Sequence, residues 1–396
     1  MRPEMDYFAF RVTRARFARG ARAGTTQKVN ATRAAFLVAG LGMAAWAPLV
    51  PYVKSRLAVD DGTLGLLLLC LGGGSVGCMP LCNRLIKKFG CRRMVCVGAT
   101  LFSVALPLMA IMPTVPTMAM SLLLFGIGMG LLDVSMNVNA LLVERESGQQ
   151  LMSGFHGLYS VGGIVGSVFA SSLLTIGARP LVVAFFVLFV VGGILYTFFP
   201  NLMTRGKASE PGSRLVFPHG VVILMGMMCL CVFLVEGAML DWSAIFLTST
   251  KDYPKELAGF GYTAFAITMA AGRLVGDRLS RRYGAGRMVL AGCACGATGI
   301  AVALFAPSGA LAMFGYAIVG IGCSNVVPLL FSAAGKQKAM DPGAAISALT
   351  TLGYGGVLAG PAAIGVVSHA IGLSASFGLL AFLLALAAIG SRVALR

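Results

Sequence analysis

Long apolar stretches separated by short polar segments follow one another through almost the whole chain. About 20 consecutive apolar residues are needed to cross the hydrocarbon core of a bilayer. Inside a bilayer no water binds exposed backbone groups, so segments of this kind have to be helices. We therefore predict twelve transmembrane helices, at about residues 33–53, 62–82, 94–112, 115–143, 153–176, 180–200, 219–247, 257–280, 287–306, 309–334, 343–368 and 373–391.

The second half of the chain repeats the first. Residues 78–174 align with residues 272–368 without a gap, at a constant offset of 194 residues. Gly162 and Gly166, which fall on Gly356 and Gly360, are spaced as in a close helix crossing. A half-chain repeat in an apolar protein predicts an all-α integral membrane fold made of two pseudo-symmetric six-helix bundles. Membrane transporters use this arrangement to build a site that can open to either side.

We expect four segments along the chain. They are a basic cytoplasmic tail, a first six-helix bundle, a cytoplasmic linker and a second six-helix bundle, at residues 1–30, 31–200, 201–218 and 219–396. Arginines interleave with apolar residues in the tail. Two alternatives stay open there: an amphipathic segment on the inner leaflet, or a disordered tail.

Composition and charge agree with a membrane protein. Hydrophobic residues make up 58% of the chain and charged residues only 11%, against about 25% charged residues in soluble domains. The net charge is +17, but most Lys and Arg residues lie in predicted loops on one side. This asymmetry predicts a multi-pass inner-membrane protein, here expected to be a monomer, with both termini in the cytoplasm. The positive charge is a topology signal, so we expect a lipid bilayer and no nucleic acid as partner.

The ten cysteines lie within or beside the predicted helices. Cys78 and Cys82 share a helix face, but no histidine or third cysteine accompanies them, so we expect packing roles, no metal and no cofactor. The sequence also lacks a nucleophile–base pair and a phosphate-binding loop. We therefore do not expect an enzyme.

Acidic residues at membrane depth are the sharpest functional signal. Of the fourteen Asp and Glu residues, only Asp133 and Glu236 fall well inside a predicted span. An ionisable residue there is energetically expensive and points to function, and burial favours its neutral form, which permits proton exchange. Asn137 lies four residues after Asp133 and shares its helix face. The alternative is that these carboxyl groups only form hydrogen bonds between helices.

Basic residues are missing from mid-membrane positions, apart from Arg273 near the inner end of the eighth predicted helix. A carrier of phosphate esters or dicarboxylates usually needs a buried basic clamp. We therefore expect an acidic cavity free of bases and a neutral polar or cationic substrate.

Residues near the predicted helix ends are candidates for gating. Asp277 could accept hydrogen bonds from a neighbouring helix and latch the inner side, and Asn83 is its uncharged counterpart in the first half. The alternative is that the basic segments around them are only topology signals. The further gating candidates are Arg84, Arg278, Asp241 and His156.

The twelve spans, the half-repeat and the paired basic loops together resemble the major facilitator superfamily, over residues 31–396. Within it, the chain is similar to YbjJ-type inner-membrane transporters. The stretches that carry this similarity are residues 155–162, 236–242 and 354–361.

Residues 133–137 more distantly resemble the acid-x-x-x-Asn stretch in the fourth helix of fucose-permease-like sugar–proton symporters. This resemblance implies a proton-coupling role for Asp133 and a sugar contact for Asn137. Fucose permeases also carry an acid in the first helix, which is missing from residues 40–52 here. In the first basic loop, Met79 and Asn83 replace the usual small residue and Asp.

We expect a secondary active transporter that moves a small neutral polar solute, such as a sugar, by alternating access with proton coupling. Asp133 would carry the proton and Glu236 would complete the acidic lining. The candidate substrate contacts are Asn137, Trp46, Asn325 and Tyr354. Two alternatives stay open: a proton antiporter for drugs or hydrophobic cations, and a non-transporting membrane sensor on a transporter scaffold.

Overall fold

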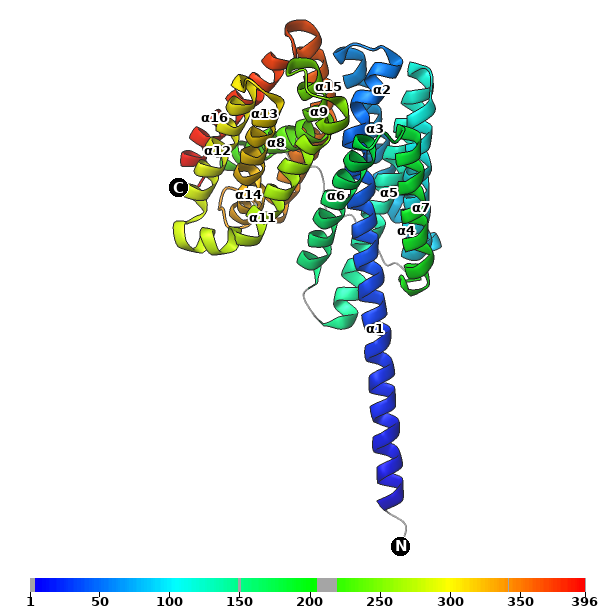
Figure 1. The fold of residues 1–396 in the computed structure, drawn as a ribbon. Helices are drawn as coiled ribbons and strands as arrows, with labels where there is room; N and C mark the ends of the chain where they lie inside the picture. Colours follow the sequence, from blue (N-terminus) through cyan, green and yellow to red (C-terminus); the bar gives the residue numbers. More distant parts are fainter. Residues whose placement is uncertain (1–3, 149–150, 205–218, 341, 396) are drawn as a thin grey trace.

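Two helical bundles lie side by side and meet at one end of the molecule (Figure 1). The structure, a computed structural model, describes the backbone of residues 4–148, 151–204, 219–340 and 342–395. Side chains are described from Gly24 onward, apart from residues 80, 83, 153, 277, 342–344, 346, 347 and 354. Every regular element within these ranges is a helix. The all-α architecture predicted from the sequence is therefore confirmed.

The first bundle is built from the helices that precede the predicted linker. They are α1 (Glu4–Trp46), η1 (Ala47–Leu49), α2 (Val50–Leu57), α3 (Asp61–Phe89), α4 (Cys91–Ile111), α5 (Val115–Ser147), α6 (Met152–Thr175), α7 (Pro180–Phe198) and η2 (Phe199–Asn201). The backbone of the basic tail is helical from Glu4 and runs directly into the first span. Most of the linker lies outside the described residues.

The second bundle follows the same plan. Its helices are α8 (Val221–Asp241), α9 (Ser243–Thr250), α10 (Lys255–Ala258), α11 (Phe260–Tyr283), α12 (Ala285–Phe305), α13 (Gly309–Cys323), α14 (Val326–Ala334), α15 (Pro342–Ile371) and α16 (Leu373–Ala394).

The internal repeat extends to the helix ends. Shifted by the offset of 194 residues, the bounds of α4 coincide with those of α12. The N-cap Thr114 of α5 corresponds to the N-cap Ser308 of α13, and both side chains accept a hydrogen bond from a backbone amide of the first turn. Gly90 and Gly284, which end α3 and α11, have φ of 83° and 84°, a region that favours glycine.

Packing inside the bundles follows the same symmetry, since α1 packs on α6 and α8 packs on α15. Gly162 and Gly166 of α6 lie against the carbonyls of Leu37 and Leu41 of α1, where a Cβ would collide with backbone. The close helix crossing predicted from the glycine spacing is therefore confirmed.

Among the described residues, eleven helical segments are long and apolar enough to cross a membrane. The predicted span that is not among them, at about residues 257–280, corresponds to α11, which is 24 residues long and packs within the second bundle. Arg273 and the basic residues of its last turn lower its mean hydropathy. Tertiary packing, more than apolar content, therefore identifies α11 as a member of the twelve-helix fold.

The two bundles touch through α3 with α15 and through α6 with α11, two pairings that the repeat makes equivalent. Polar contacts join them at the end opposite the N-terminus. Asp61 of α3 accepts a hydrogen bond from Ser368 of α15, and Thr263 of α11 donates to Ser167 of α6 at 3.0 Å. We call the Asp61–Ser368 contact the outer latch, where outer means only the end of the bundles away from the N-terminus.

Asp60 sits beside the outer latch as the N-cap of α3. Its carboxylate accepts the backbone amide of Thr63 at 2.7 Å, and this hydrogen bond lowers the pKa of Asp60. His369 Nδ1 lies 3.8 Å from the same carboxylate, from the other bundle.

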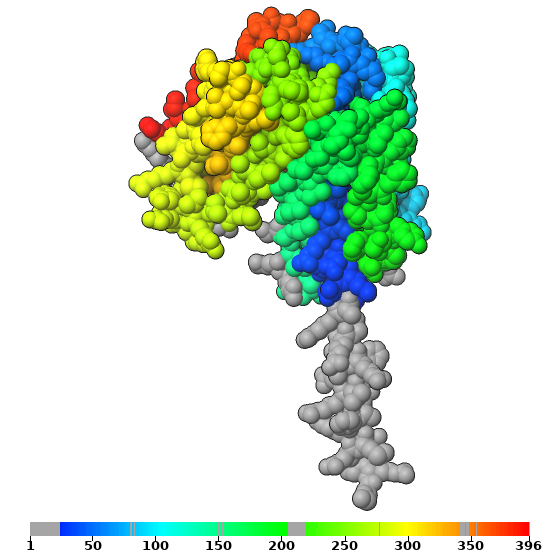
Figure 2. All heavy atoms as spheres, viewed as in Figure 1, coloured from blue at the N-terminus to red at the C-terminus, as the bar shows by residue number. Residues whose placement is uncertain are grey.

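At the other end the bundles diverge. Figure 2 shows the molecule hollowed between them on the side toward which α1 projects. The structure is therefore closed at the outer latch and open on the side of the N-terminus.

Candidate functional site

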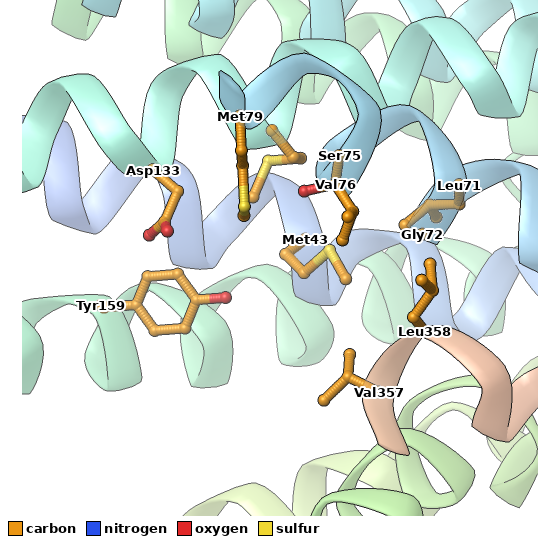
Figure 3. A pocket seen from close by; sticks show the side chains of 11 residues that line it. Met43, Leu71, Gly72, Ser75, Val76, Met79, Asp133, Tyr159, Val357 and Leu358 are labelled. Carbon is orange, nitrogen blue, oxygen red and sulfur yellow. The ribbon is translucent and has the colours of Figure 1, made fainter. Parts of the chain in front are cut away.

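Asp133 faces a cavity of about 230 Å³ between the two bundles. Figure 3 shows its carboxylate pointing toward the ring of Tyr159 from α6, with Val357 and Leu358 reaching in from the second bundle. The lining is otherwise mainly apolar and rich in thioethers. It consists of Met43, Leu71, Gly72, Ser75, Val76, Met79, Met129, Asp133, Tyr159, Val357 and Leu358. We call it the Asp133 cavity.

Asn137 contacts Asp133 and does not line the cavity. Its Nδ2 donates to Asp133 Oδ1 at 3.2 Å and to the Asp133 carbonyl at 2.9 Å. The two residues therefore share a face of α5, as the four-residue spacing predicts. Asn137 does not line the Asp133 cavity itself, so its geometry is that of a residue that positions the carboxylate.

A second cavity, of about 240 Å³, contains Glu236 of α8 and Arg273 of α11. We call it the Glu236 cavity. Arg273 Nη2 lies 3.7 Å from Glu236 Oε1, and 43% of the Arg273 side chain and 23% of the Glu236 side chain are exposed. The lining comprises Gly40, Met43, Ala44, Tyr159, Ser160, Gly163, Phe233, Glu236, Gly237, Leu240, Tyr262, Phe265, Ala266, Met269, Ala270, Arg273 and Val357.

The two cavities adjoin, because Met43, Tyr159 and Val357 line both of them. Together they reach the range of about 300–1,000 Å³ that is usual for small-molecule sites. Side chains from both bundles contribute to the walls. A solute bound here would therefore contact both halves of the repeat.

Arg273 corrects the expectation of a cavity free of bases. Its guanidinium lines the Glu236 cavity, and its Nε donates to the Ser324 carbonyl at 3.4 Å. Pro328, four residues after Ser324, has no backbone N–H to offer that carbonyl. The helix is interrupted at this point, between α13 and α14. Arg273 therefore satisfies a carbonyl that the proline leaves open, and it also faces Glu236.

Asn325 and Trp46, like Asn137, are predicted substrate contacts that lie outside both linings. Asn325 Nδ2 donates to the Gly272 carbonyl at 2.8 Å and to Ser324 Oγ at 2.9 Å, which holds the break after α13 against α11. Trp46 is fully buried at the end of α1. The side chain of Tyr354, the remaining predicted contact, lies outside the described residues.

The residues predicted to act in gating differ in their exposure and in their neighbours. The side chains of Asn83 and Asp277 lie outside the described residues. Arg84 and Arg278 are exposed, on helices of opposite bundles. His156 is exposed at the start of α6, with its ring edge-on to Phe36 at 5.1 Å, and it is close enough to Arg273 to interact electrostatically.

Asp241 is buried in the last turn of α8. Within the described part of the chain, neither its Oδ1 nor Trp46 Nε1 has a hydrogen-bond partner by distance and angle. The indole N–H of Trp46 nevertheless lies near the carboxyl group of Asp241, across the bundles. We regard this as a loose contact, because its geometry falls short of a hydrogen bond.

Sequence reasoning missed Tyr159 and the three methionines of the Asp133 cavity, Met43, Met79 and Met129. Tyr159 lies three residues before Gly162 on the helix face that packs on α1, so the glycine spacing could have indicated it. No comparable signal singles out the methionines, because methionine is common in any apolar span. Among the described residues, no group of three or more His, Cys, Asp or Glu side chains is placed to hold a metal.

Comparison with known proteins gives consistent results. Residues 34–339 match the profile of the Major Facilitator Superfamily. An uncharacterized MFS-type transporter of Yersinia pestis is 47% identical over 375 residues, covering 94% of this chain and 97% of the relative. Membrane protein MosC of Rhizobium meliloti is 30% identical, covering 88% and 86%.

Solved structures support the fold. A mutant of the nucleoside transporter NupG superposes with a TM-score of 0.75 at 14% identity, covering 93% of this chain and all of that one. A bacterial homolog of the human lysosomal transporter Spinster, in an inward-facing and unoccupied conformation, gives a TM-score of 0.66 at 14% identity, covering 94% and 97%. At this identity the likeness concerns the fold alone.

Proposed function

Since the chain belongs to the Major Facilitator Superfamily, we propose that it is a proton-coupled secondary transporter that moves a small neutral polar solute by alternating access. A sugar is one candidate, and a nucleoside is another because NupG is a nucleoside transporter. Within the superfamily we place the chain near the YbjJ-type transporters, with a more distant relation to fucose permeases. The membrane we propose is the inner membrane, with both termini in the cytoplasm.

The observation that carries this proposal is the pair of adjoining cavities between the bundles. They are lined from both halves of the repeat and lie between a closed outer latch and an open opposite side. Rocking of one bundle against the other would expose such a site to each side in turn. With the termini in the cytoplasm, the open side is the inner one.

Asp133 is the proton-binding group in this proposal. It is a carboxyl group at membrane depth in a mainly apolar cavity, and its described side-chain hydrogen bond comes from Asn137. Among the described residues no basic side chain lines the Asp133 cavity, and burial of an acid in such a setting favours its neutral form, so that it can exchange a proton. Glu236 lies beside Arg273. It is therefore better suited to stay ionised than to bind and release the coupled proton.

Transport by the Asp133→Asn variant tests the proton assignment. We expect counterflow, which needs no proton gradient, to persist in proteoliposomes, while accumulation driven by a pH gradient falls at least about tenfold, because an amide cannot bind the coupled proton. The matched control is Asp252→Asn, in an exposed loop position, which should accumulate substrate normally. Full gradient-driven accumulation by Asp133→Asn would contradict the assignment.

A second candidate, a proton antiporter for hydrophobic cations, is favoured by one feature. Met43, Met79 and Met129 give the Asp133 cavity a flexible, polarisable wall, and such walls adapt to varied apolar ligands. Aromatic cations that compete for transport where sugars and nucleosides do not would favour this candidate. A protein that binds a ligand but shows no counterflow would be a sensor rather than a transporter.

A further inference from the structure

We infer that the transported solute is a small zwitterion with an apolar body, held with its ammonium group at Glu236 and its carboxylate at Arg273. This inference rests on the proposed transport function and names the substrate class for the Glu236 cavity. A zwitterion carries no net charge, so it belongs to the neutral polar solutes.

The first argument is the geometry of the charge pair. Arg273 Nη2 and Glu236 Oε1 are 3.7 Å apart, whereas a direct hydrogen bond between such groups is about 2.7–2.9 Å long. Within the described part of the chain, Glu236 Oε1 is shielded from solvent and accepts no hydrogen bond. The two charges are therefore close enough to balance each other but do not satisfy each other.

The second argument is the position of both groups on the cavity wall. An ion pair formed only for stability would be expected to close into direct hydrogen bonds, because buried charges are costly unless their bonding capacity is filled. Arg273 is instead held by its Nε contact to Ser324, and its guanidinium stays partly exposed. A ligand that presents an ammonium and a carboxylate on one carbon would supply the missing partner to each side chain.

The third argument is the rest of the wall. Phe233, Leu240, Phe265 and Met269 form an apolar surface beside the charge pair. The Glu236 cavity, of about 240 Å³, is slightly smaller than the range of about 300–1,000 Å³ that is usual for small-molecule sites, which favours a small solute. This apolar part of the lining fits a hydrocarbon or aromatic side chain.

The charge pair also selects against other solute classes. A cation would be attracted by Glu236 but repelled by Arg273. An anion would be attracted by Arg273 but repelled by Glu236. A like charge at this distance costs binding free energy, so each singly charged solute is disfavoured. A sugar leaves both ions with hydroxyl partners only. A zwitterion is the class that fits both charges at once.

The test is a binding series on the purified full-length protein in detergent, using phenylalanine, phenethylamine and hydrocinnamate. Phenethylamine lacks the carboxylate and hydrocinnamate lacks the ammonium, while the apolar body stays the same. A ligand that binds only the folded state raises the melting temperature. We expect phenylalanine to bind at least about tenfold more tightly than either analogue, because each analogue loses one charge-assisted contact.

Substitutions at the two charged residues assign the charges. Glu236→Gln should weaken binding of phenylalanine about tenfold or more and Arg273→Gln should do the same, whereas Arg273→Lys, which keeps the charge, should retain part of the binding. Glu256→Gln and Arg281→Gln remove the same charges at exposed positions and should leave binding unchanged. If Arg273→Gln does not fold because the Ser324 contact is lost, Glu236→Gln still decides, since it leaves that contact intact.

Either of two results in the binding assay would overturn the inference. One is stabilisation by a sugar or nucleoside with no response to any zwitterion of this size. The other is zwitterion binding that survives both glutamine substitutions. Counterflow of a sugar that is insensitive to Glu236→Gln would reject the zwitterion site and leave the transporter proposal standing. Absence of counterflow for a zwitterion that binds would reject transport and leave the binding site standing.

Discussion

Asn137 and Asn139 show how two identical residues on one helix take different roles. Asn139 is fully buried; its Nδ2 donates to Thr32 Oγ1 at 2.8 Å and its Oδ1 accepts the Met203 amide at 2.9 Å. It therefore ties α5 to α1 and to the segment after η2. Asn137 faces Asp133 instead. The neighbours of each amide, rather than its chemistry, decide between structure and function.

The Asn139→Ala substitution should destabilise the protein without a direct effect on the cavity. It leaves the buried Thr32 hydroxyl and Met203 amide without these partners, which we expect to lower the free energy of unfolding by about 1–3 kcal/mol. Thermal denaturation of the purified protein in detergent measures this. A melting temperature equal to that of the wild type would mean that water or another side chain replaces both hydrogen bonds.

At the scale of elements, glycines let helices approach to backbone contact. In a bilayer the hydrophobic effect does not drive helices together, so close van der Waals packing carries more of the association. Gly162 lies against the Leu37 carbonyl, whereas a Cβ at the neighbouring Gly163 would be 3.8 Å from its closest contact, Ala44 Cβ. Adjacent glycines on α6 thus differ in how much space surrounds them.

Gly162→Ala should therefore be destabilising and Gly163→Ala should not. A Cβ at position 162 meets backbone that cannot rotate away, and forced overpacking of this kind costs about 1–3 kcal/mol. At position 163 the added methyl makes an ordinary contact, and alanine also favours the helix. Comparison of the two melting temperatures is the measurement. Equal values would show that α1 and α6 can separate without cost.

At the scale of the whole molecule, the outer latch closes one end of the cavities. The Asp61 carboxylate receives the Ser368 hydroxyl from the opposite bundle and pairs with Lys54 of its own bundle. Gly65 and Gly365 bring α3 and α15 close together beside it. The proposed alternating access requires this contact to break when the molecule opens at this end.

Ser368→Ala should make opening at the latch end easier. Loss of one hydrogen bond to a charged acceptor corresponds to roughly a tenfold change in the opening equilibrium. Hydrogen–deuterium exchange at the start of α3 and in the last turns of α15 should accelerate accordingly. The control is Ser391→Ala, because Ser391 is buried in α16 and donates to a carbonyl of its own helix. Unchanged exchange in Ser368→Ala would show that the latch does not limit opening.

The sequence alone predicted the fold, and it also predicted part of the candidate site. Span lengths and the glycine spacing can be read from short stretches of the chain, because the bilayer acts on each span separately. The offset of 194 residues can be read by aligning the two halves of the sequence. The same reasoning found Asp133 and Glu236, since a carboxyl group at membrane depth stands out in any apolar sequence. The sequence did not predict that the Trp46 ring is buried or that Asn325 holds the helix break after α13.

Only the tertiary structure decided what surrounds each carboxyl group. Glu236 and Arg273 are 37 positions apart in sequence and come from different helices, so helix rotation and crossing geometry determine whether they meet. Packing between helices also brings Arg273 to the Ser324 carbonyl, which Pro328 leaves without a backbone donor. It likewise places Tyr159 in the lining of both cavities. Local periodicity sets which residues enter the membrane, whereas long-range packing sets their partners, and these partners determine the chemistry of the site.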